Sequence, residues 1–232
     1  MSRRPKTAVG RDTGAMRGGT PVYRRLKDML LEGGLARSAW IPVDQIAAEF
    51  GVSRQPVMDA IRRLSVEGFV EVVPQVGSRL RVYSTTEIRD FFGLFGASEA
   101  YVARLAAERI GEEDMLDLRL ISARIGAIRR TGKSAAERGR LYRMLNRKLH
   151  NAIGNATGSV AISEVAETLR DRADFFIASE HYAIFAGRLE NAYAEHEDIL
   201  DAIEKGDGDA AANAMAVHIR GVRISLFHDA AE

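Results

Sequence analysis

The sequence contains no cysteine, and none of its five prolines follows Pro74. The absence of cysteine excludes disulfide bonds, thiol catalysis and cysteine-ligated zinc. No apolar run reaches the roughly eighteen residues of a membrane helix, and no secretory segment follows the N-terminus, so we expect a cytoplasmic protein with no membrane partner. The absence of proline from the later part of the chain removes the residue that interrupts helices most strongly.

The formal charge is nearly balanced, with 33 Lys and Arg against 32 Asp and Glu, but the charges are unevenly placed. Residues 1–82 carry 14 basic and 8 acidic side chains, whereas residues 83–232 carry 19 and 24. A basic N-terminal part on an acidic remainder is typical of a protein whose first part meets nucleic acid, although charge runs are also common on solvated faces. Residues 1–19, rich in Arg, Gly, Ser and Thr, are expected to form a flexible tail.

The pattern within residues 43–69 predicts two short helices joined by a tight turn. Ile46 and Phe50 give the first helix an apolar face, and Gly51 can adopt the left-handed conformation that ends a helix. The second helix begins after Ser53, which is a natural N-cap. The positions of this helix that face the core are Val57, Ile61 and Leu64.

A strand-rich segment follows at residues 70–82, and it predicts a β-hairpin with its tip at Gln75–Ser78. An amphipathic helix over residues 20–33 precedes the two short helices. Together these elements have the layout of a winged helix-turn-helix, which places its second helix in the DNA major groove. The positions of that helix left outside the core are candidate DNA contacts, among them Arg54, Gln55, Met58 and Arg62.

The remainder of the chain predicts an antiparallel bundle of six helices. Ser84–Glu87, with the sequence S-T-T-E, is a capping box that begins the first of them. The fold class is therefore mainly α with a small β-hairpin wing, and after the tail we expect a DNA-binding domain at residues 20–83 and a helical domain at residues 84–232. The helices predicted in the bundle cover residues 84–110, 112–131, 134–155, 158–181, 186–205 and 208–229.

Three histidines and one asparagine lie beside apolar stripes in the predicted bundle. Asn146 and His150 are four residues apart and share one helix face, while His196 and His218 belong to the last two helices. Three imidazoles and an oxygen ligand that converge inside a bundle suit a divalent transition metal such as Zn, Ni or Mn. The alternative is that these histidines are ordinary core residues whose nitrogens find protein partners.

The two parts of the chain together resemble the GntR family of bacterial transcription regulators, in particular the FadR-like branch with a C-terminal FCD domain. The resemblance spans roughly residues 20–229. The N-terminal motifs that carry it are Ile46-Ala47, Gly51-Val52-Ser53-Arg54, Pro56-Val57, Ala60-Ile61, Arg63-Leu64 and Glu67-Gly68, with Pro74 and Gly77 in the wing. The C-terminal motifs are Asn146-x-x-x-His150, Glu195-His196, Gly206-Asp207 and Met215 with His218.

The resemblance implies a homodimer that binds a short palindromic operator in double-stranded DNA and responds to a small organic acid as its effector. It also implies a divalent metal at the floor of the effector pocket, where the effector carboxylate can complete the coordination. The implied metal ligands are Asn146, His150, His196 and His218. The resemblance also implies three further candidate DNA contacts, which are Gln45, Ser53 and Gly77.

The chain departs from the family pattern at several functional positions. Many relatives carry arginine where this chain has Gln45, Met58 and Val76, and arginine can contact guanine or clamp a phosphate. Relatives also often have arginine at the position of Phe95. The effector carboxylate is therefore predicted to bind Arg143 instead.

The sequence thus predicts a ligand-responsive DNA-binding transcription regulator and not an enzyme, because no general base accompanies the histidines. Two alternatives stay open at this point. One is a metal-dependent enzyme acting on a small acid, in which a three-histidine metal activates water. The other is a winged-helix module that contacts protein, because Met58 and Val76 stand where arginine is usual.

Overall fold

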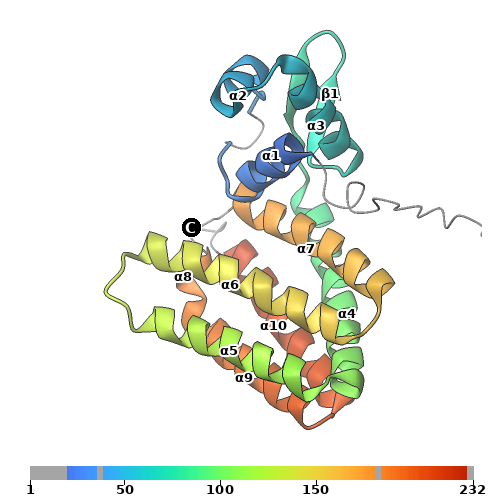
Figure 1. Ribbon diagram of the computed structural model, residues 1–232, viewed down its shortest axis with the longest axis vertical. Helices are drawn as coiled ribbons and strands as arrows, with labels where there is room; N and C mark the ends of the chain where they lie inside the picture. The colour runs from blue at the N-terminus through green and yellow to red at the C-terminus, as the bar shows by residue number, and fades with distance from the viewer. Residues whose placement is uncertain (1–19, 36–38, 181–183, 229–232) are drawn as a thin grey trace, which may run out of the picture. The chain divides into compact units, whose positions relative to one another are not determined.

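The computed structural model describes residues 20–35, 39–180 and 184–228, and the tail predicted at residues 1–19 lies outside these ranges. Helices dominate the chain (Figure 1). The chain divides into two compact units, and the second begins at Val82 and also includes Leu31–Gly33.

The N-terminal unit contains the helix-turn-helix that the sequence predicts. Gly51 ends its second helix with a φ of 66°, a left-handed conformation that glycine adopts without a steric penalty. The helices of this unit are α1 (Pro21–Leu31), α2 (Val43–Phe50) and α3 (Arg54–Val66). Its core forms where their apolar faces meet, and the side chains with no exposed surface are Leu26, Val57, Ile61 and Leu64.

The β-hairpin wing is shorter than predicted. Strand β1 (Val70–Val73) pairs antiparallel with β2 (Gly77–Leu80), with Val73 opposite Gly77. The turn is therefore Pro74–Val76 and not Gln75–Ser78, because Gly77 and Ser78 already belong to the second strand.

The C-terminal unit is a helical bundle in which α4 and α10 lie side by side (Figure 1). Its helices are α4 (Thr85–Arg109), α5 (Glu112–Arg129), α6 (Ala135–Ala156), α7 (Val160–Glu180), α8 (Ile184–Gly187), α9 (Leu189–Glu204) and α10 (Gly208–His228). The single helix predicted over residues 186–205 is instead the short α8 followed by α9. Arg188 is the N-cap residue of α9 and separates the two.

Capping boxes fix the starts of α4 and α6. In each, a serine hydroxyl accepts the backbone N–H of a glutamate three residues later, and the glutamate carboxylate accepts the backbone N–H of the serine. Ser84 and Glu87 form the predicted one, and Ser134 and Glu137 form a second that the sequence S-A-A-E also encodes. An N-cap of this kind contributes about 1 kcal/mol to stability.

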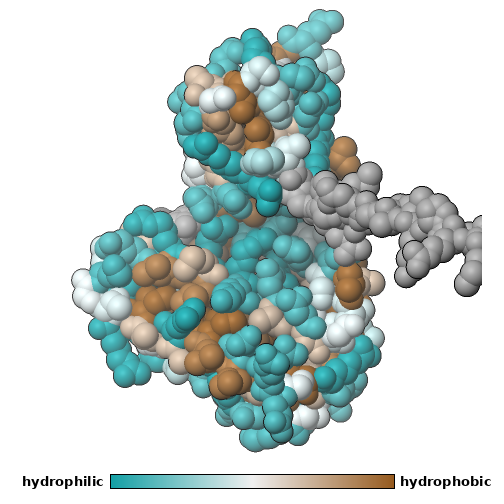
Figure 2. Space-filling model, viewed as in Figure 1, coloured by the Kyte–Doolittle hydropathy of each residue, from teal (hydrophilic) through white to brown (hydrophobic). Residues whose placement is uncertain are grey.

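The face of the C-terminal unit seen in Figure 2 is largely hydrophilic, but apolar side chains gather over α5 and α6. Leu116 and Leu120 on α5 and Met144 on α6 are each more than half exposed. Exposed apolar surface is where protein partners commonly bind. None of the described helices is long and apolar enough to cross a membrane.

Candidate metal centre and DNA-binding surface

Three histidines from three helices converge in the interior of the C-terminal unit. His150 lies on α6, His196 on α9 and His218 on α10, and one ligand nitrogen of each lies within 4.8 Å of the others. All three side chains are buried, and the ring centroids of His196 and His218 are 4.6 Å apart. Helix α4 packs against α6, α9 and α10, and this brings these distant sequence positions together.

A buried ion pair holds the ring of His150. Its Nδ1–H donates to Oε2 of Glu99 (2.7 Å), and Nε of Arg170 donates to Oε1 of the same carboxylate (3.0 Å). Burial acts to raise the pKa of Glu99, but Arg170 and His150 outweigh it and hold the pKa below its usual value. The guanidinium of Arg170 lies against Gly154, where a β-carbon would stand only 3.1 Å from Nη2. This arrangement leaves Nε2 of His150 available to a ligand.

The ring of His218 is held in the same way. Its Nδ1–H donates to Oε2 of Glu195 (2.7 Å), and Nη2 of Arg188 donates to both oxygens of that carboxylate (2.9 and 2.7 Å). A β-carbon at Gly221 would stand 2.6 Å from Nη2 of Arg188. Burial lowers the pKa of His218, although Glu195 opposes this shift. A carboxylate that accepts the Nδ1–H fixes the tautomer that metal-binding histidines need.

His196 has no such partner. Both of its ring nitrogens are buried without a hydrogen bond to any described residue. Burying a polar atom without a hydrogen bond costs about 1–3 kcal/mol of folding free energy. A ligand that binds the His196 ring would remove this cost, and none of the described side chains does so. Burial lowers the pKa of His196 well below its ordinary value, with His218 and His150 adding to the effect, so the ring is neutral and can offer a lone pair. A satisfied core histidine does not fit these observations.

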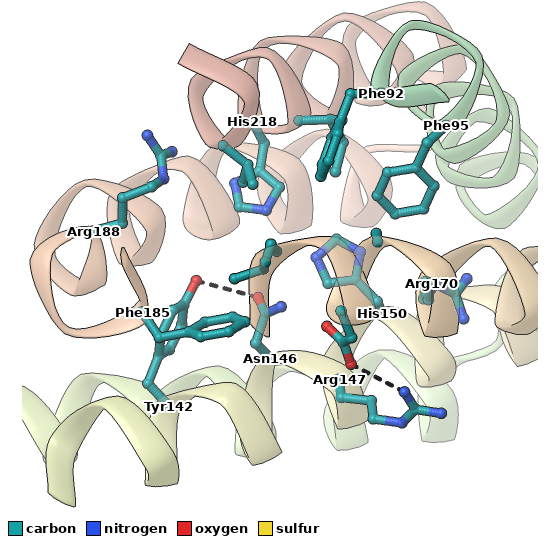
Figure 3. Close-up of a pocket in the computed structure, with 15 residues that line it drawn as sticks. Phe92, Phe95, Tyr142, Asn146, Arg147, His150, Arg170, Phe185, Arg188 and His218 are labelled. Atoms are coloured by element: carbon teal, nitrogen blue, oxygen red, sulfur yellow. Dashed lines mark hydrogen bonds and ion pairs between the residues drawn. The ribbon is translucent and has the colours of Figure 1, made fainter. Parts of the chain in front are cut away.

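A cavity of about 50 Å³ adjoins the histidines (Figure 3). Figure 3 shows the rings of His150 and His218 beside it, with Phe92 and Phe95 of α4 close by. Asn146 also lines the cavity, and its Oδ1 accepts a hydrogen bond from the hydroxyl of Tyr142 (3.2 Å). The four residues predicted as metal ligands therefore lie in one region, although His196 itself does not line the cavity.

Charged side chains reach the same cavity, but Arg143 is not among them. Nη2 of Arg143 lies 3.6 Å from Oδ2 of Asp174. The arginine one turn later, Arg147, lines the cavity together with Arg170 and Arg188. An anion in the cavity would thus meet these three guanidinium groups.

The sequence assigned no role to the two glutamates and two arginines that hold the histidines, although Glu195 is part of the Glu195-His196 motif. One signal pointed to them. Glu99 falls in the apolar stripe of α4, four residues after Phe95 and three before Val102, and it is as buried as they are. A carboxylate in such a stripe requires a buried cation, because an unpaired charge is excluded from the core.

The residues predicted to contact DNA lie on the surface of the N-terminal unit. Met58 on α3 is partly buried, and the exposed ones are Gln45, Ser53, Arg54, Gln55, Arg62 and Gly77. Asp59, which was not among the predicted contacts, accepts hydrogen bonds from Nε2 of Gln55 (3.1 Å) and Nη1 of Arg62 (2.8 Å). Exposed pairs of this kind contribute little to stability, so their donors can exchange for phosphate or base contacts.

Comparison with known protein families decides the class of the chain. The FCD domain matches residues 97–221, which is more than half of the chain, and the gntR family of bacterial regulatory proteins matches residues 20–80. The chain belongs to the GntR family.

Known GntR-like proteins resemble the chain along most of its length. An uncharacterised HTH-type transcriptional regulator in an unstable DNA locus of Streptomyces ambofaciens is 30% identical over 87% of this chain and 81% of its own. The HTH-type transcriptional repressor RspR of Escherichia coli K12 is 27% identical over 88% of this chain and 87% of its own. Among solved structures, E. coli McbR/YncC shares the fold, with a TM-score of 0.76 and 20% identity over 90% of this chain and 96% of that one.

The family and these relatives are transcription regulators, so this GntR-family chain is a DNA-binding transcription regulator and not an enzyme. The alternative of a metal-dependent enzyme is therefore set aside. The predicted fold class, a winged helix-turn-helix with a helical bundle, is confirmed.

Proposed function

We propose that this regulator senses a small organic acid in its helical domain, residues 84–232, through a bound divalent metal. Its winged domain, residues 20–83, binds operator DNA, and the protein acts in the cytoplasm as a homodimer. The observation that carries this proposal is the convergence of three buried histidines beside an arginine-lined cavity, with both ring nitrogens of His196 unpaired.

The donor set suits Zn, Ni or Mn, because neutral imidazoles and an amide oxygen are ligands that these ions accept. The hydrogen bonds to Glu99 and Glu195 keep the Nε2 lone pairs of their histidines available. The Tyr142 hydroxyl orients the amide of Asn146, whose oxygen keeps a second lone pair. When bound, the metal supplies a positive, Lewis-acidic centre for a carboxylate. The residues that would hold it are Asn146, His150, His196 and His218.

The cavity suits a small anion. Arg147, Arg170 and Arg188 offer charge-assisted hydrogen bonds to a carboxylate, while Phe92 and Phe95 suit a short carbon chain. The cavity volume of about 50 Å³ leaves room for a small ligand. The lining favours these arginines over Arg143 as the effector contacts.

Operator binding is assigned to the exposed surface around α3. Ser53 and Arg54 at its start suit phosphate, Gln55 suits adenine, and Met58 suits the methyl group of thymine. A homodimer must place its two α3 helices about 34 Å apart on the DNA, so an effector that alters bundle packing would alter affinity. Exposed apolar side chains over α5 and α6 are consistent with a second copy as partner.

The metal is tested by elemental analysis of the purified protein and of the His196→Ala and His218→Ala variants. Metal at about one ion per chain in the wild type and its loss from both variants is the expected result. Equal metal content in all three proteins would show that the histidines are only core residues. Glu108→Gln, an exposed change on α4, is the control that should keep the metal.

Operator binding is tested by measuring the affinity for DNA from the promoter region of the protein's own gene over a series of salt concentrations. Because phosphate contacts release counterions, affinity should fall steeply as salt rises. Affinity that does not change with salt would instead favour the winged-helix module that contacts protein. Adding a small organic acid to the metal-loaded protein should shift this affinity, and the metal-free protein should not respond.

A further inference from the structure

The cavity wall contributed by α7 carries two opposite charges one turn apart. Arg170, Ala173, Asp174 and Ile177 all line the cavity, and their spacing places them on one face of the helix. Arg170 suits an incoming acid, but the carboxylate of Asp174 repels one. The presence of a carboxylate in the lining of a cavity proposed to bind anions therefore requires a physical explanation.

Only one carboxylate oxygen of Asp174 has a partner among the described residues. Its Oδ2 accepts a hydrogen bond from Nη1 of Arg147 (3.0 Å) and lies 3.6 Å from Nη2 of Arg143. Its Oδ1 has no hydrogen-bond partner in the part of the chain that the structure describes. An ionised carboxylate offers about four acceptor positions, so at least half of this capacity is unused. Burial raises the pKa of Asp174 in spite of the two arginines, as expected for a carboxylate that lacks donors.

The neighbouring aspartate on α7 provides a contrast. Asp171 is also buried and also pairs with Arg147, but it does not line the cavity. Asp171 therefore neutralises Arg147 as a purely structural residue. Asp174 has the same structural partner and, in addition, a place in the cavity lining.

We propose that Asp174 determines effector specificity: its unpaired Oδ1 accepts a hydrogen bond from a hydroxyl or ammonium group of the acid, so the pocket selects hydroxy acids or amino acids over plain carboxylic acids. This inference rests on the proposed function, because it assumes that an acid occupies the cavity. The carboxylate of the effector lies toward the histidines and Arg170, and its donor lies toward Asp174.

The spacing of the two charges limits the distance between the two groups of the effector. Side chains four residues apart on a helix have β-carbons about 5–6 Å apart, so carboxylate and donor are separated by about two to four bonds. The small volume of the cavity, about 50 Å³, likewise favours a short carbon skeleton. Butyrate and its hydroxy and amino derivatives span this range with one carbon skeleton.

The test measures the binding of seven acids to the metal-loaded full chain by isothermal titration calorimetry: butyrate, the 2-, 3- and 4-hydroxybutyrates, and the 2-, 3- and 4-aminobutyrates. At least one derivative should bind about 10- to 100-fold more tightly than butyrate, because a hydrogen bond to a charged group has about this effect. If butyrate binds as tightly as every derivative, the inference is wrong and the acid-sensing proposal stands. If none of the seven binds, both fail.

The Asp174→Asn variant assigns the preference to this residue. Its amide oxygen will turn toward Arg143 and Arg147, which leaves the NH₂ group facing the cavity and replaces an acceptor by a donor. The preference for the best derivative over butyrate should fall below about threefold, while butyrate itself binds within about threefold of the wild type. Asp171→Asn is the matched control and should keep the full preference. Equal loss of preference in both variants would show that Asp174 acts only through packing, as would loss of butyrate binding in Asp174→Asn alone.

Discussion

Replacing Glu99 with glutamine removes the negative charge of a side chain that pairs with both His150 and Arg170, and it changes the shape of that side chain very little. The carboxylate is 1% exposed and accepts hydrogen bonds from Arg170 and from His150, so the substitution leaves a buried guanidinium without its counter-ion. Removing one partner of a buried ion pair costs about 3–5 kcal/mol. Glutamine keeps the volume of the side chain and one acceptor oxygen, so we expect a loss of folding free energy at the lower end of this range, about 3 kcal/mol. Because the pKa of Glu99 is held below its usual value, this stabilisation is fully present at pH 7.

Thermal unfolding followed by circular dichroism at pH 7, with chelator present to exclude any metal, measures this loss. A destabilisation of about 1 kcal/mol lowers Tm by about 2–4 °C in a chain of this size, so Glu99→Gln should melt about 6–12 °C below the wild type. Glu108→Gln removes an exposed carboxylate from the same helix and should melt within about 2 °C of the wild type.

A double variant separates the charge from the packing. Buried ion pairs replaced as a whole by apolar side chains are often neutral or stabilising, so Glu99→Met with Arg170→Met should be more stable than Glu99→Gln. A double variant that melts below the single one, or a single variant that melts with the wild type, would refute the assignment of this energy to the charge pair.

Four further outcomes are expected. The pKa of His196 lies below its ordinary value of 6.5, so the unfolded chain binds more protons below that pH and the metal-free protein should lose stability as pH falls through 6.5; urea midpoints at pH 7.5 and 5.5 would show this, with a smaller change in His196→Phe. Leu149→Ala should cost about 2–5 kcal/mol in urea unfolding, because Leu149 has no exposed surface. Ser134→Ala should cost about 1 kcal/mol in the same assay through loss of the α6 cap. Met58→Arg should steepen the salt dependence of binding to duplex DNA by about one unit of slope, and an unchanged slope would place position 58 away from the phosphates.

The sequence was sufficient to predict the elements whose signals are local. Apolar periodicity located α3 and the long helices, Gly51 marked the end of α2, and the S-T-T-E motif at Ser84 marked the start of α4. The break at Arg188 was missed although Gly187, which precedes it, is the residue type that most often follows the end of a helix. The wing turn was placed one to two residues late because glycine and serine suit a turn as well as a strand end.

The predicted site was less complete because its supports come from distant parts of the chain. The ion pair that holds His150 joins residues 51 and 71 positions apart, Glu99 with His150 and Glu99 with Arg170, and no local pattern encodes such a meeting. The helical periodicity of the sequence also could not predict whether Arg143 or Arg147 lines the cavity, because residues four apart lie on the same face of a helix. These two lie one turn apart on α6, and only the packing of α7 against α6 decides which of them reaches the cavity.

The glycines that lie against the two buried arginines have a genetic consequence. Gly154 and Gly221 bear no functional group, yet a methyl group at either would press on the guanidinium of Arg170 or Arg188. A single nucleotide change that converts one of these glycines to alanine would displace an arginine, then its glutamate, and then the histidine that the glutamate orients. Selection for a regulator that no longer responds to its signal can therefore act through helix positions that touch neither metal, nor acid, nor DNA.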